Sequence, residues 1–161
     1  NVIGGGDWAL DRIIPDCIRA LESNKPIEIR NPKAIRPWQH VLEPLSGYML
    51  LASKMWDEPT KYCEGWNFGP RAESITSVWK VATKVIENYN NRGELRDISD
   101  PDALHEARLL MLDISKAKFL LGWEPRMNIN QCVALTIDWY KGYKQNSIYE
   151  LCLNEISTFL V

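Results

Sequence analysis

Residues 1–9 read NVIGGGDWA, and the fold depends on what the glycine triplet does. The letters Gly4-x-Gly6-x-x-Ala9 fit the dinucleotide-binding pattern G-x-G-x-x-G/A. Such a loop follows a strand, opens a helix within a βαβ unit and precedes an acidic residue about 20 positions later. Only three residues precede the triplet, and no complete βαβ unit follows it. The sequence therefore favours a sharp turn that needs positive φ, or a close approach of backbone to a ligand, over a nicotinamide loop.

Hydrophobic periodicity predicts one helix-rich α/β domain without the βαβαβ alternation of a complete nucleotide-binding sheet. Helices are expected over residues 12–23, 44–56, 76–90, 115–121, 129–144 and 147–159, and short extended segments over 26–30, 35–41, 65–70 and 109–112. Asp11 and Thr76 are the expected N-caps of the first and third helices. Gly122 is expected to end the fourth helix, and the acidic stretch at residues 97–102 is expected to be a loop.

Composition argues against several classes of partner. The net charge is -2 and the pI is near 5.7, which favours neither nucleic acid nor an anionic membrane surface. No apolar run approaches the roughly 18 residues of a membrane span, and no signal peptide is evident. The four cysteines are scattered, so we expect free, mostly buried thiols and a cytoplasmic location. Neither His40 nor His105 has a second ligand at metal-binding spacing, and no G-x-S-x-G motif indicates a serine nucleophile.

Four arginines are candidates for anion binding: Arg12, Arg30, Arg36 and Arg108. A guanidinium group offers a planar fork that suits phosphate, although any one of these arginines could equally be a solvated surface charge. Arg36 stands out because the segment Arg36–His40, RPWQH, crowds a charge, two aromatic rings and an amide into a short extended stretch. Such clusters are more typical of ligand clefts than of plain surfaces.

Several segments together resemble one family. They include NVIGGGDWA at residues 1–9, IRNP at 29–32, RPWQHVLEPLSGY at 36–48, WNFGP at 66–70, LDISKA at 112–117 and LGWEP at 121–125. With them the chain resembles the CDP-glucose 4,6-dehydratases, which belong to the extended short-chain dehydrogenase/reductase superfamily. The resemblance implies that residues 1–161 form the small C-terminal substrate-binding lobe of such an enzyme. NAD and the catalytic Tyr-x-x-x-Lys pair would lie in an N-terminal Rossmann domain that precedes Asn1.

The resemblance also implies a reaction and a division of labour. The full-length enzyme, a lyase of deoxysugar biosynthesis, would oxidise C4 of CDP-glucose with NAD, eliminate water across C5 and C6, and return the hydride to C6. This chain would then hold no catalytic, cofactor-binding or metal-binding residue, and we expect it to be inactive alone. Two alternatives remain open: the lobe of another nucleotide-sugar epimerase or dehydratase, or a stand-alone, non-catalytic binding module.

Residue by residue, the resemblance implies a substrate site. Asn1, Arg12 and Arg36 would contact the diphosphate, and the strand from Glu28 to Arg30 would lie along the base. Trp38 completes the predicted site, whereas Arg108 departs from the family pattern and is not included. The glycine triplet would then turn the chain so that Asn1 and Arg12 face one diphosphate. We also expect a homo-oligomer, because an isolated lobe would expose the apolar face that meets the Rossmann domain.

Overall fold

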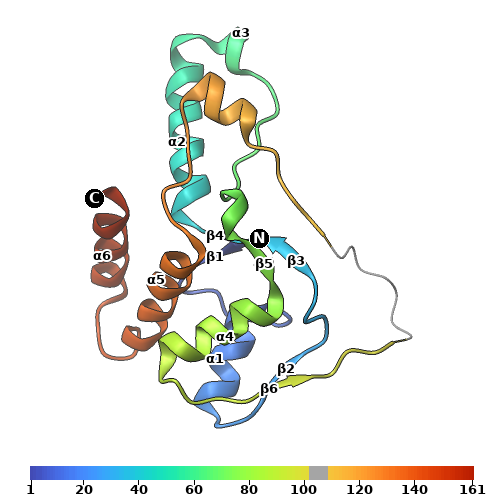
Figure 1. Cartoon of the computed structure of the whole chain (residues 1–161). Helices are drawn as coiled ribbons and strands as arrows, with labels where there is room; N and C mark the ends of the chain where they lie inside the picture. The colour runs from blue at the N-terminus through green and yellow to red at the C-terminus, as the bar shows by residue number, and fades with distance from the viewer. Residues whose placement is uncertain (102–108) are drawn as a thin grey trace.

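Helices dominate the computed structural model, which describes residues 1–101 and 109–161 (Figure 1). They are α1 (Ile13–Glu22), α2 (Leu42–Asp57), α3 (Pro59–Tyr62), α4 (Val78–Tyr89), α5 (Ile129–Gly142) and α6 (Ile148–Leu160), with a 3₁₀ turn at Ala72–Ser74 and a π-helix at Ala117–Leu121. The strands are β1 (Val2–Ile3), β2 (Ile27–Ile29), β3 (Ile35–Pro37), β4 (Gln39–His40), β5 (Ile75–Ser77) and β6 (Leu95–Asp97). This composition confirms the helix-rich α/β prediction.

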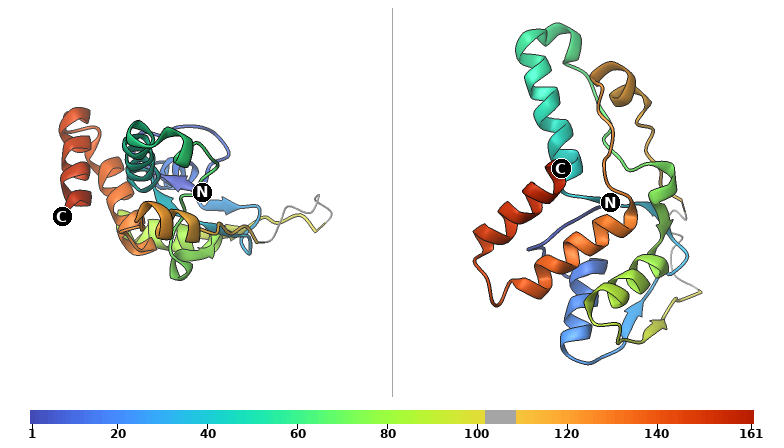
Figure 2. Two further views of the ribbon diagram at one scale, coloured as in Figure 1. Left: turned by 90° about the horizontal axis from the view of Figure 1, so that it is seen from above. Right: turned by 60° about the vertical axis from the view of Figure 1, so that its left-hand side comes forward.

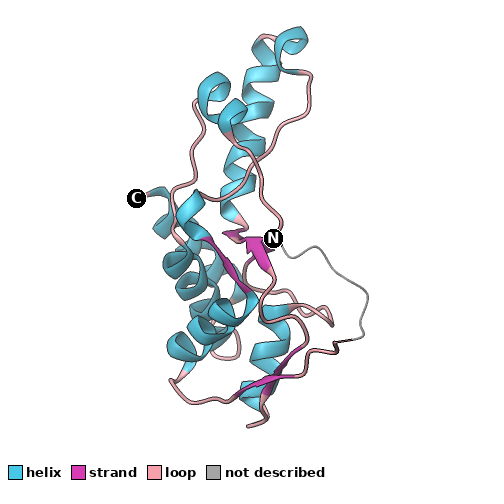
Figure 3. Ribbon diagram, turned by 45° about the vertical axis from the view of Figure 1, so that its right-hand side comes forward, coloured by secondary structure: helices cyan, strands magenta, loops and turns pink. Residues whose placement is uncertain are grey.

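The strands of the described residues form three separate pairs rather than one sheet (Figure 3). β1 pairs with β4 in parallel, with Ile3 opposite His40, and β2 pairs with β6 in parallel, with Ile27 opposite Leu95. β3 and β5 run antiparallel. Within the described part of the chain, no complete nucleotide-binding sheet is formed, as the sequence predicts.

The main core lies where α4 contacts both α1 and α5. Each helix buries one apolar stripe, and Ile18 of α1, Val85 of α4 and Val133 of α5 are fully buried. A buried aliphatic side chain of this size stabilises the fold by about 1.5–3 kcal/mol relative to an exposed one. α6 packs along α5 and ends at the C-terminus (Figure 2).

A second cluster lies where α2, α3 and the π-helix project together from the rest of the molecule (Figure 1). Its buried members are Tyr62, Phe68, Ala117, Leu121 and Trp123. Gly47 of α2 lies against the Phe68 ring so closely that an added Cβ would be 2.3 Å from Cδ1 of Phe68. The part of the molecule formed by α2, α3 and the π-helix therefore has a small core of its own.

Several expected boundaries are wrong. Asp11 is not an N-cap: Arg12 occupies that position of α1 without a side-chain hydrogen bond, and Asp11 has a φ of +62°. Ser77, not Thr76, caps α4, because the Ser77 hydroxyl accepts from the Lys80 N–H at 3.3 Å. Gly122, with a φ of +72°, ends the π-helix as predicted.

The extended segments also differ from expectation. Residues 65–70 form no strand, and residues 109–112 make a single bridge from Leu109 to Ile35. β6 lies partly within the stretch expected to be a loop, because it pairs with β2, which is distant in sequence. All four cysteines are free, but Cys63 and Cys152 are exposed, so the thiols are not mostly buried.

Candidate functional site

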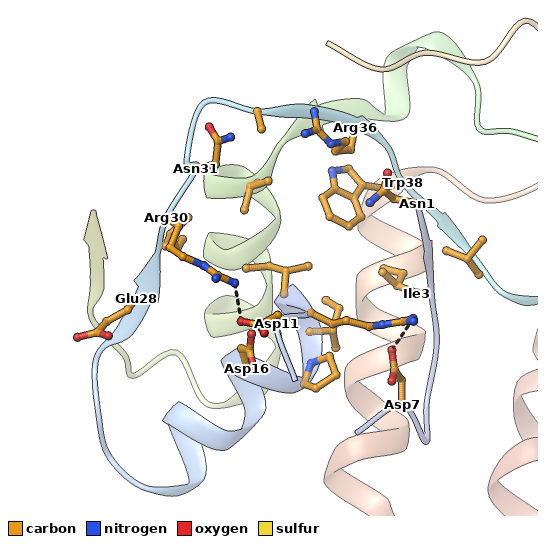
Figure 4. Close-up of a pocket in the computed structure, with 18 of the residues that line it drawn as sticks. Asn1, Ile3, Asp7, Asp11, Asp16, Glu28, Arg30, Asn31, Arg36 and Trp38 are labelled. Carbon is orange, nitrogen blue, oxygen red and sulfur yellow. Dashed lines mark hydrogen bonds and ion pairs between the residues drawn. The ribbon is translucent and has the colours of Figure 1, made fainter. Parts of the chain in front are cut away.

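A cavity of about 870 Å³ opens between β1, the start of α1, β2 and β3 (Figure 4). Its volume falls in the range typical of small-molecule sites, roughly 300–1,000 Å³. All the residues of the predicted substrate site line this cavity: Asn1, Arg12, Glu28, Arg30, Arg36 and Trp38. None of them lines a second cavity of about 520 Å³ beside the start of α4. The structure thus gathers side chains that the sequence separates, while their contacts with a ligand stay a prediction.

The glycine triplet makes the turn that brings the two ends of this segment to one cavity. Gly6 has a φ of +79°, which an L side chain rarely adopts, so the predicted sharp turn is confirmed. A Cβ on Gly5 would lie 2.1 Å from Cγ of Trp139, so the backbone here packs against a ring of α5. The close approach at Gly5 is therefore to the protein itself. A two-residue strand, β1, precedes the triplet, although the sequence indicates none.

The loop after the triplet, residues 7–12, is tied to the helices behind it. The Tyr140 hydroxyl donates to the carbonyl oxygen of Asp7. Arg19 of α1 donates to the carbonyl oxygens of Trp8 and Ala9, each at 3.1 Å. The Trp8 ring also lies edge-on to Tyr140, with the ring centroids 5.1 Å apart. These contacts hold the loop backbone at the rim of the cavity.

Two aspartates of this loop pair with arginines that line the cavity (Figure 4). Nη1 of Arg12 lies 3.3 Å from Oδ2 of Asp7, and Nη2 of Arg30 lies 2.6 Å from Oδ1 of Asp11. The Arg12 and Arg30 side chains are 64% and 68% exposed, so both pairs are open to solvent. Sequence reasoning missed these aspartates, although each stands one to five residues from an arginine already singled out.

Arg36 and Trp38 form the inner wall of the cavity and are 7% and 4% exposed. Nη1 of Arg36 donates to the carbonyl oxygen of Ile35 at 2.9 Å, and Nε1 of Trp38 donates to the carbonyl oxygen of Thr76 at 3.0 Å. Because the indole N–H is already used, Trp38 offers the cavity an apolar ring rather than a donor.

The remaining predicted residues differ in how they face the site. Asn1 lines the cavity, and its backbone nitrogen donates to the carbonyl oxygen of Pro37 at 2.9 Å. The Glu28 carboxylate points away from the other labelled side chains, so it does not join the charged cluster (Figure 4). Arg108 and His105 lie outside the described residues.

The described lining residues offer groups suited to ligand binding: arginine donors, an apolar wall and three aspartates (Asp7, Asp11 and Asp16). Within residues 1–101 and 109–161, no three His, Cys, Asp or Glu side chains lie close enough together to hold a metal ion. In the same part of the chain, no helix combines the length and apolarity needed to cross a membrane.

Comparison with known sequences identifies a relative that matches almost the whole chain. The chain is 43% identical, over 99% of its length, to CDP-glucose 4,6-dehydratase of Salmonella typhimurium. It covers 45% of that protein, matching its C-terminal part. No protein-family model matches the sequence.

Solved structures with the same fold include dTDP-glucose 4,6-dehydratase from Bacillus anthracis in complex with NAD. The TM-score is 0.75 at 18% identity, over 90% of this chain and 43% of that one. UDP-glucuronic acid 4-epimerase from Bacillus cereus, in complex with UDP-glucuronic acid and NAD, gives 0.72 at 18% identity, over 89% and 43%. At these identities the match concerns the fold alone: the chain has the fold of a part of these dehydratases and epimerases.

Proposed function

We propose that this chain is the nucleotide-sugar-binding lobe of an NAD-dependent CDP-glucose 4,6-dehydratase. The observation that carries the proposal is the cavity between β1, α1, β2 and β3, which every residue of the predicted substrate site lines. The 43% identity to CDP-glucose 4,6-dehydratase of Salmonella typhimurium supports this substrate. Arg12 and Arg36 would bind the diphosphate with guanidinium donors, assisted by Asn1, because paired phosphate charges need such donors in a cavity.

The base would lie along β2. The backbone of Glu28 and Arg30 has edge donors and acceptors, whereas the Glu28 carboxylate points away from the cluster (Figure 4). The Trp38 ring would contribute an apolar surface to the inner wall. In this arrangement the lobe selects and orients the nucleotide sugar, and a second part of the enzyme performs the reaction.

NAD would be bound outside this chain. The glycine triplet is the segment whose letters fit a dinucleotide loop, but Gly5 packs against Trp139 and Gly4 lies against Val41. A pyrophosphate needs a glycine backbone that is open to the ligand, so the crowding at Gly5 argues against this triplet as a dinucleotide loop. The full-length protein would be a lyase, and the 161-residue chain would be inactive alone.

Calorimetric titration of the chain with CDP, UDP and dTDP tests this proposal. We expect CDP to bind most tightly and Arg36→Ala to weaken CDP binding about ten- to hundredfold, since a hydrogen bond to a charged group contributes about 1.5–3 kcal/mol. Arg71→Ala is the control, because Arg71 donates to the carbonyl oxygen of Pro125 and does not line the cavity. Unchanged CDP affinity in Arg36→Ala would contradict the phosphate role.

A second candidate is the lobe of a different nucleotide-sugar enzyme. The chain shares its fold with a UDP-glucuronic acid 4-epimerase and a dTDP-glucose 4,6-dehydratase, and this similarity supports the second candidate. Tighter binding of UDP or dTDP than of CDP would favour this second candidate. Formation of a 4-keto product by the isolated chain with NAD and CDP-glucose would contradict the proposal that another part of the enzyme performs the reaction. It would also exclude a stand-alone binding module.

We also propose that the chain self-associates. Tyr48, Met49 and Trp56 of α2 are 56%, 74% and 89% exposed, which leaves three large apolar side chains of this helix open to solvent. Light scattering over a wide concentration range tests this, and a monomer at every concentration would contradict it.

A further inference from the structure

Two of the cavity's arginines already have anionic partners in the chain itself. Asp7 holds Arg12 at 3.3 Å, and Asp11 holds Arg30 at 2.6 Å. All four side chains line the same cavity. A guanidinium group binds carboxylate and phosphate with the same set of N–H donors, so the two anions compete for it.

The loop that carries these aspartates has anchors other than Arg12 and Arg30. Tyr140 donates to the backbone carbonyl oxygen of Asp7, and Arg19 donates to the carbonyl oxygens of Trp8 and Ala9. Arg19 and Tyr140 do not line the cavity. The Asp7 carboxylate can therefore turn away from Arg12 while the backbone of residues 7–9 stays in place.

The backbone at Asp11 supports a special role for its side chain. Asp11 has a φ of +62°, a conformation that costs a residue with a Cβ about 1–2 kcal/mol. Asp and Asn tolerate it better than most residues, and here it accompanies the contact with Arg30 across the cavity. A strained position that delivers a carboxylate to a pocket arginine points to function rather than to stability.

We propose that Asp7 and Asp11 set the affinity of the phosphate site, because each occupies one arginine until a phosphate group displaces it. This inference rests on the proposed function for its nucleotide ligand. The carboxylates also remain near the incoming phosphate and repel it. Because exposed ion pairs are weak, the competition lowers the affinity by a moderate factor and leaves the site able to bind.

The test is calorimetric titration of the 161-residue chain with inorganic pyrophosphate and, separately, with CDP, at low ionic strength. Asp7→Asn keeps the Oδ1 acceptor for the Ala9 N–H, at 3.0 Å, and Asp11→Asn tolerates the positive φ. Each substitution should tighten the binding of both ligands about two- to fivefold. Asp16→Asn is the matched control: Asp16 lines the same cavity but pairs with Arg19, so only the smaller effect of lost negative charge is expected.

A double-mutant cycle isolates the competition from changes in stability. In an Arg12→Ala background, Asp7→Asn should keep only the smaller effect of lost negative charge that Asp16→Asn shows, because the arginine it releases is gone. Thermal melting of every variant shows whether it is folded. An effect of Asp7→Asn that is undiminished in the Arg12→Ala background would overturn the inference for Arg12.

The two ligands separate failure of the inference from failure of the proposed function. Unchanged or weaker pyrophosphate binding by Asp7→Asn and Asp11→Asn, or gains no larger than that of Asp16→Asn, overturns the inference. Absence of pyrophosphate binding in both the parent chain and the Asp7→Asn/Asp11→Asn double variant overturns it as well. If pyrophosphate binding tightens as expected but CDP binds no better than pyrophosphate, the inference stands and the nucleotide-sugar function fails.

Discussion

The Nε2 atom of His40 lies 3.8 Å from Oε1 of Glu155, and neither atom has a hydrogen-bond partner among the described residues. His40 belongs to β4 and its side chain is fully buried, whereas Glu155 comes from α6. The Leu42 N–H donates to Nδ1 of His40 at 3.4 Å, so the neutral imidazole carries its proton on Nε2, toward the carboxylate. The contact links the C-terminal helix to the core.

Burial shifts the pKa values of the two groups in opposite directions. It lowers the pKa of His40 from 6.5 to about 4 and raises the pKa of Glu155 from 4.5 to about 7. The stability contributed by neutral His40 is present above pH 6.5 and is lost as the pH falls toward 4. The contribution of protonated Glu155 is present below pH 4.5 and is lost as the pH rises through 7. Between pH 4.5 and 6.5 the two slopes cancel.

We therefore predict that Glu155→Gln exposes the slope of His40. Its free energy of unfolding should rise by up to about 3 kcal/mol between pH 4 and 6.5, while the parent chain stays flat from pH 4.5 to 6.5. Urea unfolding at half-unit pH intervals measures this. A parent chain and a Glu155→Gln variant with parallel pH profiles would show that Glu155 does not titrate in this window.

His40→Gln should expose the opposite slope. Without the imidazole, the free energy of unfolding should fall as the pH rises from 4.5 to 7, because Glu155 still titrates with a raised pKa and His40 no longer offsets it. Burial also raises the pKa of Glu43 and of Cys132. If the free energy of unfolding of the His40→Gln/Glu155→Gln double variant no longer changes with pH, the slopes of the single variants come from His40 and Glu155. If a slope persists in the double variant, it comes from Glu43 instead.

Gly5→Ala should destabilise the fold by about 1–3 kcal/mol, as overpacking of a filled site does. The added Cβ would lie 2.1 Å from Cγ of Trp139. Gly65→Ala is the matched control, since no atom lies within 4 Å of its added Cβ, and it should change the melting temperature little. Trp139→Leu should reduce the cost of Gly5→Ala, and equal costs in both backgrounds would refute the steric explanation.

The sequence predicts elements well where one apolar stripe dictates the periodicity. α1 and α5 begin and end within a few residues of expectation, because their buried faces repeat at three- and four-residue spacing. β6 was missed because Leu95–Asp97 is polar and becomes a strand only through its pairing with β2. The prediction that Asp11 caps α1 is wrong, because the Asp11 side chain forms an ion pair with Arg30 instead.

The residues of the candidate site also divide into those that the sequence predicts and those that it does not. Arg12, Arg30 and Arg36 could be singled out as candidates for anion binding from residue type, and the fold brings them to one cavity. The sequence does not predict that Asp7 and Asp11 pair with arginines of the cavity. These pairings depend on the path of the loop, which is set by Gly6 and by the hydrogen bond from Tyr140 to Asp7. Pairings made across a folded loop carry no periodicity that a sequence could reveal.

Glu43→Ala should lower the free energy of unfolding by about 2–5 kcal/mol, whereas Glu43→Gln should lower it by less than about 1 kcal/mol. Glu43 is fully buried, and its Oε1 accepts from the backbone N–H groups of Arg126 and Met127 at 2.8 and 2.6 Å. Alanine leaves both donors without an acceptor, and the Met127 donor is buried, while glutamine keeps the acceptor and removes the carboxylate. Urea unfolding measures the difference, with the exposed Glu58→Ala as control. Equal losses for alanine and glutamine would mean that the carboxylate charge, not the acceptor, holds the segment after Pro125 against α2.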